Sequence, residues 1–176
     1  QLLALTLRDA TPRFGKIDYD QDGKLVGSWF LEGTGGYSGN KSGQEGYWAG
    51  PLSIVPDGND PSQPDLSFGS YPASTAGGQD QAQQFTVASG PDPATVDQST
   101  GLIKYEYGTT VRYQAETGAV WGGQTYLPHL RVKAGPVQGT VLLQLTGQRQ
   151  LKLELFPGQR ATELTGYTDR AVRYER

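Results

Sequence analysis

Apolar and polar residues alternate most clearly in the last third of the chain. Valine and leucine occupy every second position in 141–145, and leucines alternate with charged residues in 151–156. A period of two is typical of a strand with one buried face, and the short glycine-containing connection indicates a turn. The pattern predicts an antiparallel hairpin with Leu143 and Leu153 buried and Glu154 in solvent.

Shorter segments with strand-like patterns recur along the rest of the chain, separated by Gly, Pro and Asp. With the hairpin they give about ten short strands, the pattern of an antiparallel barrel or sandwich. A barrel is favoured because closure removes exposed strand edges. We therefore predict an all-β fold with little helix, as an antiparallel β-barrel or, second, a β-sandwich. The predicted strands outside the hairpin are 17–20, 24–31, 47–55, 66–71, 84–89, 102–107, 129–133 and 171–176.

The chain length of 176 residues fits one domain, 1–176, with 1–16 as a candidate peripheral N-terminal segment. Helix interiors are disfavoured by 25 Gly and 11 Pro, so we expect helical turns only at 91–96 and 158–164.

The charge balance narrows the set of partners. The 15 basic and 18 acidic residues give a net charge of −3, whereas nucleic-acid binders usually carry a basic surplus. No apolar run approaches the length of a membrane span. We expect no nucleic acid and no membrane span, and the oligomeric state stays open.

The chain has neither Cys nor Met, and it starts at Gln1. Without Cys there are no disulfides, no thiolate catalysis and no Cys-based zinc site. The start at Gln1 is that of a processed, trimmed or cloned fragment. With the richness in Gly, Tyr, Thr and Gln, it favours an extracellular or periplasmic location.

The spacing of Asp18, Asp20 and Asp22, followed by Gly23, is that of the first half of a calcium loop. The twelfth loop position, which needs a bidentate acid, falls on Trp29, and the flanks read as strands. Asp-Gly is also the preferred turn between two strands. We favour the turn and keep calcium, the one cofactor considered, as the alternative.

The segment Gly27-Ser28-Trp29 resembles the Gly-x-Trp motif that the calycins, meaning lipocalins and avidins, carry on their first barrel strand. The resemblance implies an up-and-down barrel that encloses one small ligand. It also implies a basic residue stacked on Trp29, for which Arg170 and Arg173 are the candidates. The chain departs from the family by its leading segment and by lacking an evident C-terminal helix and disulfides. Trp29 is equally well explained as an ordinary core aromatic.

Aromatic residues suggest what a binding site would contain. In the leading hypothesis, non-catalytic binding of a small, partly apolar ligand in the barrel mouth, the lining is Trp29, Trp48, Tyr105 and Trp121. The same rings beside amides and carboxylates could bind a sugar. A carbohydrate-binding module with structural calcium, and a β-rich surface or assembly protein, are therefore kept as alternatives.

Catalysis finds little support, and the sequence leans toward a protein that is not an enzyme. His129 is the only histidine, its strand pattern points it outward, and no Gly-x-Ser-x-Gly elbow is present. A pair among Glu106, Glu116 and Glu154 could serve a glycosidase. Glu106 and Glu154 are better explained as solvated charges on a strand face.

Overall fold

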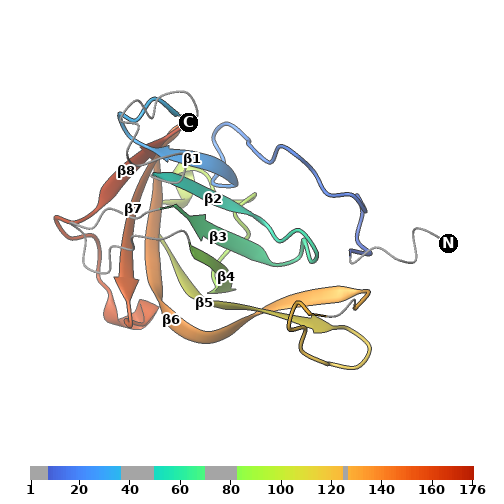
Figure 1. The fold of residues 1–176 in the computed structure, drawn as a ribbon. Helices are drawn as coiled ribbons and strands as arrows, with labels where there is room; N and C mark the ends of the chain where they lie inside the picture. Colours follow the sequence, from blue (N-terminus) through green and yellow to red (C-terminus); the bar gives the residue numbers. More distant parts are fainter. Residues whose placement is uncertain (1–7, 37–49, 70–82, 125–126) are drawn as a thin grey trace.

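The computed structural model describes residues 8–36, 50–69, 83–124 and 127–176. Its eight antiparallel strands form one closed barrel in which β8 pairs with β1 (Figure 1). The predicted antiparallel barrel with little helix is confirmed. The strands are β1 (Gly27–Leu31), β2 (Pro51–Pro56), β3 (Pro64–Phe68), β4 (Gln83–Ser89), β5 (Ile103–Gln114), β6 (Leu130–Gly147), β7 (Gln150–Pro157) and β8 (Val172–Glu175), with 3-10 helices η3 (Gln98–Thr100) and η4 (Ala161–Glu163).

The barrel interior is filled with apolar side chains from all eight strands. The predicted hairpin is β6–β7, in which Leu143 pairs with Leu153 and both are fully buried. The inward-facing leucines of both strands contribute to this core, as the alternation requires.

Two departures reduce about ten predicted strands to eight. Residues 17–20 form no strand, and the predicted strands 129–133 and 141–145 merge into one continuous strand, β6, which begins at Leu130. The glycines between these two segments bend the strand instead of ending it. A Cβ at Gly108 would lie 2.6 Å from the Gly135 oxygen, so only glycines allow β5 and β6 to approach this closely.

Beyond this bend, the outer parts of β5 and β6 and the described part of their connection, residues 109–124 and 127–134, form an arm that reaches past the barrel on the side of the β2–β3 connection (Figure 1). Residues 119–121 fold back onto β5: the Gln114 amide donates to the Ala119 oxygen at 2.9 Å, and Tyr113 bridges to Val120.

The connection between β7 and β8, residues 158–171, covers part of the outer barrel face. Leu142, Phe156 and Leu164 form a small buried cluster there. Glu154 is fully buried and accepts a hydrogen bond from the Thr168 amide at 2.7 Å. The prediction that Glu154 faces solvent is therefore wrong, because alternation identifies the outer face but does not say what covers it.

Part of the N-terminal segment is tied to the barrel. Arg8 is buried and donates from Nη1 to the Gly58 oxygen at 2.9 Å. Asp9 accepts two hydrogen bonds from Arg131 on the arm, at 2.7 and 3.0 Å. Of the candidate peripheral segment 1–16, these two residues pack against the domain.

Candidate functional site

Trp29 lies at the end of the barrel where β1 begins and β8 finishes, which we call the Arg176 end. Trp29 is fully buried, and its Nε1 donates to the Leu25 oxygen at 2.9 Å. The Arg176 guanidinium carbon lies 3.9 Å from the centroid of the Trp29 ring, a cation–π contact. A guanidinium does stack on Trp29 as expected, but it belongs to Arg176 and not to Arg170 or Arg173.

The alternation of β8 explains which arginine reaches Trp29. Tyr174 is buried in the core, so Arg173 points outward and Arg176 returns to the side of Tyr174. Arg170 precedes β8, and its Nε lies 3.5 Å from the Glu154 carboxylate on the outer face.

Arg176 also fastens the chain segment that crosses this end. Its side chain is 3% exposed, and its Nη1 donates to the Val26 oxygen at 2.9 Å. Its Nη2 donates to the Gln21 oxygen at 2.7 Å and to the Lys24 oxygen. Burial lowers the pKa of Arg176, and the charge of Asp20, 3.9 Å from Nη1, opposes that change.

Gly27 is required by close packing at the start of β1. Its φ is 129°, and a Cβ there would lie 2.4 Å from both Arg176 Nη1 and Asp20 Oδ1. Asp20 Oδ1 in turn accepts a hydrogen bond from the Ser28 amide at 2.6 Å. All three residues of the Gly27-Ser28-Trp29 segment therefore serve the Arg176 end. Gly27 leaves room for Arg176 and Asp20, the Ser28 amide bonds to Asp20, and the Trp29 ring stacks on Arg176.

The three aspartates of the candidate calcium loop have separate partners. Asp18 Oδ1 accepts from the Asp20 amide at 2.8 Å, and Asp22 Oδ1 lies 3.6 Å from Arg149 Nε. Residues 21–24 form a turn closed by a 3.0 Å backbone hydrogen bond. Within the described ranges, no group of three or more His, Cys, Asp or Glu could hold a metal ion.

The other predicted ligand residues are spread over the molecule. Tyr105 is fully buried in the same core as Trp29, and its hydroxyl donates to the Pro91 oxygen at 2.7 Å. Burial raises the pKa of Tyr105. Trp121 lies half-buried on the arm, and Trp48 is outside the described residues. Neither Tyr105 nor Trp121 is among the described residues that line the pocket described next.

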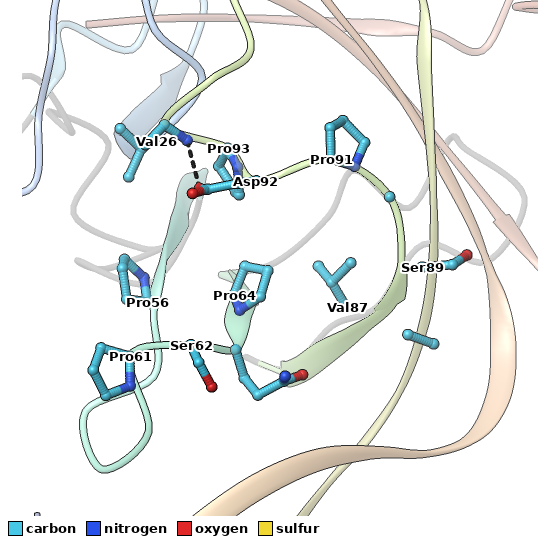
Figure 2. Close-up of a pocket in the computed structure, with 14 residues that line it drawn as sticks. Val26, Pro56, Pro61, Ser62, Pro64, Val87, Ser89, Pro91, Asp92 and Pro93 are labelled. Carbon is cyan, nitrogen blue, oxygen red and sulfur yellow. Dashed lines mark hydrogen bonds between the residues drawn. The ribbon is translucent and has the colours of Figure 1, made fainter. Parts of the chain in front are cut away.

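A pocket of about 410 Å³ opens at the rim of the Arg176 end. It lies between the β2–β3 connection and the segment that follows β4, and five of its fourteen lining residues are prolines (Figure 2). Val26 and Val87, both buried, add apolar surface. The lining prolines are Pro56, Pro61 and Pro64 on one side and Pro91 and Pro93 on the other.

The two walls are held by local side-chain hydrogen bonds. Asp57 Oδ1 accepts from the Asn59 and Asp60 amides at 2.7 and 2.9 Å, and Asp92 Oδ1 accepts from the Ala94 amide at 2.9 Å. Such turns and the fixed φ of proline restrict both segments before any ligand arrives. The volume falls within the range of small-molecule sites, ~300–1,000 Å³.

A second hollow of about 520 Å³ lies between residues 16–20 and the outer face of β1 and β2. Tyr19, Asp18 and Asp20 line one wall, and Ser28 and Ser53 line the other. Its lining of carboxylates, serine hydroxyls and a lysine is more polar than the proline and valine lining of the proline pocket.

A layer of buried carboxylates lies behind the β2–β3 wall and joins it to the arm. Asp57, Asp60 and Asp65 are 2%, 6% and 3% exposed. Asp57 Oδ2 lies 3.1 Å from Arg112 Nη2 on β5, and Asp60 Oδ2 accepts from the Val132 amide on β6 at 3.0 Å. We call Asp57, Asp60, Asp65 and Arg112 the acid layer.

Asp65 has the most perturbed carboxyl of this layer. It accepts hydrogen bonds from Thr86 Oγ1 at 2.9 Å and from Gln84 Nε2 at 2.6 Å. Burial, with the neighbouring Asp57 carboxyl, nevertheless raises the pKa of Asp65 to about 7. Asp65 therefore holds a proton through most of the acidic range.

The residues considered for catalysis have structural partners. His129 Nδ1 lies 2.5 Å from Glu116 Oε1 on the arm, and the His129 side chain is 41% exposed. Glu106 Oε1 lies 3.3 Å from Arg160 Nε and is only 13% exposed, so its expected solvation is also wrong. Glu154, Glu106 and Glu116 each lie beside a cation or a histidine.

The sequence alone predicted neither the proline pocket nor the acid layer. Residues 56–65, which contribute to both, and residues 90–97, which contribute to the pocket, nevertheless share an unusual composition. Each segment alternates Pro with Asp at short intervals. This composition indicates a turn, and only the fold shows that the two turns face each other.

No helix within the described ranges is long and apolar enough to cross a membrane. Comparison of the chain with protein families, with curated proteins and with solved structures gives no match.

Proposed function

We propose that this protein binds a small, partly apolar ligand without catalysis, in the proline pocket at the Arg176 end. The observation that carries the proposal is the preformed pocket itself, with five proline rings and two buried valines around about 410 Å³. Rigid walls favour affinity because little ordering is required on binding. The calycin resemblance supports the same kind of function, although Trp29, Tyr105 and Trp121, which the sequence suggested as lining, are not among the described lining residues.

The rest of the molecule supports a scaffold role for the barrel. The interior is packed, with Trp29 and Tyr105 fully buried among leucines. This packing favours a ligand site at the rim over one on the barrel axis. In many proteins the binding residues lie on connecting segments that a rigid sheet holds in position.

A fragment titration of the ¹⁵N-labelled protein tests the proposal. Small neutral, partly apolar probes should shift amide signals of Val26 and Val87–Ala94. Val87→Phe, at a lining position whose side chain points toward the pocket (Figure 2), should abolish those shifts by filling part of the pocket. Ser67→Phe, at an exposed position on β3 outside the lining, should leave them unchanged. Shifts that persist in Val87→Phe would contradict the proposal.

The carbohydrate alternative has one specific observation in its favour, the groove beside Tyr19. An aromatic ring, two carboxylates and two serine hydroxyls suit a sugar. It ranks second because Lys16 Nζ already lies over one face of the Tyr19 ring, 5.3 Å from the ring centroid. Saccharides that shift only residues 16–20, Ser28 and Ser53 would favour this alternative.

A further inference from the structure

Most hydrogen-bond donors around the proline pocket already donate to oxygen atoms of the protein itself. The five prolines have no amide hydrogen. The Val26 amide donates to the Pro93 oxygen at 3.2 Å, and the Gln63 amide donates to the Asp60 oxygen at 3.0 Å. The Ser62 hydroxyl donates to Asp60 Oδ1 at 2.6 Å. An anionic ligand would therefore find few of the donors that it needs.

The one formal charge among the lining residues is negative. Asp92 lies in the segment after β4, and the Ala94 amide donates to its Oδ1 at 2.9 Å. Within the described part of the chain, no lysine or arginine forms an ion pair with Asp92. By contrast, Asp97, a few residues further on, is paired with Lys24 at 3.1 Å.

The field of Asp92 acts on its surroundings. It contributes, after burial, to the raised pKa of Tyr105, whose hydroxyl bonds to Pro91 in the pocket lining. Asp92 is exposed at the pocket and has no ion-pair partner in the described part of the chain, so its charge attracts a cation that enters from solvent.

We propose that the proline pocket selects a ligand with an apolar ring body and a positively charged amine, with Asp92 as the counter-charge. The prolines and the two valines contact the ring body. The ammonium supplies the donors that this lining lacks, and the carboxylate accepts from it. This inference rests on the proposed function and adds the charge of the ligand to it.

Three probes with the same ring and different charge test the charge selection. Benzylammonium, benzyl alcohol and benzoate are titrated at neutral pH, with binding located by the amide shifts of Val87–Ala94. Benzylammonium should bind about tenfold more tightly than benzyl alcohol, as expected for a charge-assisted hydrogen bond, and benzoate should bind most weakly.

Two matched variants assign the preference to one carboxylate. Asp92→Asn keeps an acceptor for the Ala94 amide and should reduce the preference for benzylammonium to about twofold, with benzyl alcohol unaffected. Asp97→Asn, whose charge is already paired with Lys24, should keep the full preference.

The outcomes separate the two proposals. If none of the three probes shifts Val87–Ala94, both the pocket function and the charge selection are wrong. If all three bind there with equal affinity, the pocket function stands and the charge selection is wrong. A preference that survives in Asp92→Asn would also overturn the role of Asp92.

Discussion

The side chains of the barrel interior and the three carboxylates of the acid layer are almost equally buried, yet different forces stabilise the two regions. Leu143 and Leu153 are fully buried, and Asp57 and Asp65 are nearly so, at 2% and 3% exposure. Inside the barrel, stability comes from removing apolar surface from water and depends on volume. In the acid layer, stability depends on hydrogen-bond geometry and on whether the Asp65 carboxyl is protonated. Burial alone therefore does not tell which physical variable controls a region.

The largest effect should follow a change of volume in the interior. Leu143→Ala removes a fully buried side chain on β6 and should lower the free energy of unfolding by about 2–5 kcal/mol. Because no titratable group is involved, the loss should be the same at pH 5 and pH 8. Urea unfolding at both values measures it, with the exposed Ser67→Ala as control. A loss under about 0.5 kcal/mol, typical of surface positions, would contradict the described core.

The acid layer should respond to pH where the interior does not. The pKa of Asp65 is raised to about 7 from its ordinary value of 3.8, so the folded state binds a proton that the unfolded state has released. This contribution is complete below about pH 4 and is lost as the pH rises through 7, so the free energy of unfolding should fall by about 2–4 kcal/mol.

Asp65→Asn should remove this dependence, because the amide remains neutral throughout. Carboxyls with lowered pKa, such as Asp9 and Glu116, lose stabilisation in acid and act in the opposite direction. The readout is therefore the difference between native protein and variant at pH 5 and pH 8. Parallel curves for the two proteins would show that Asp65 holds no proton in the folded state.

The smallest effect should be found where a charge lies against the apolar interior. Arg176→Gln removes the cation from the face of Trp29, and the coupling between the two side chains should be about 0.5–2 kcal/mol. A double-mutant cycle with Trp29→Phe and thermal unfolding measures this coupling. Arg173→Gln, on the outward side of β8, is the matched control. Fully additive losses would mean that Arg176 acts only through its backbone partners.

The interior was predictable from sequence in a way that the acid layer was not. Alternation around Leu143 and Leu153 depends on the strand period alone, so it survives without knowledge of neighbours. The same rule, applied to β8, also explains why the prediction of Arg173 as the partner of Trp29 was wrong, since Tyr174 points inward and Arg173 outward. It failed for Glu154, because a segment close in sequence but outside the strand covers the outer face.

The candidate site depends on contacts that no local pattern encodes. Asp57, Asp60 and Asp65 lie in a segment that reads as a polar loop. Asp57 and Asp60 are joined to the arm beyond the bend at Gly108, and Asp65 bonds to Gln84 and Thr86 on β4. The proline pocket likewise needs the β2–β3 connection opposite the segment after β4. Proline and aspartate content predicts turns at both places but not their distance from each other.

The Arg176 contact has a consequence for the order in which the protein assembles. Its hydrogen bond to Val26 joins residues 150 positions apart in the sequence. During synthesis, the segment that carries Trp29 emerges early and waits for β8 before the seam can close. Pairings of such long range form slowly, and open strand edges invite association in the meantime. The unpaired edge of β1, which pairs with β8 in the folded barrel, is therefore an expected point of association between incompletely folded chains.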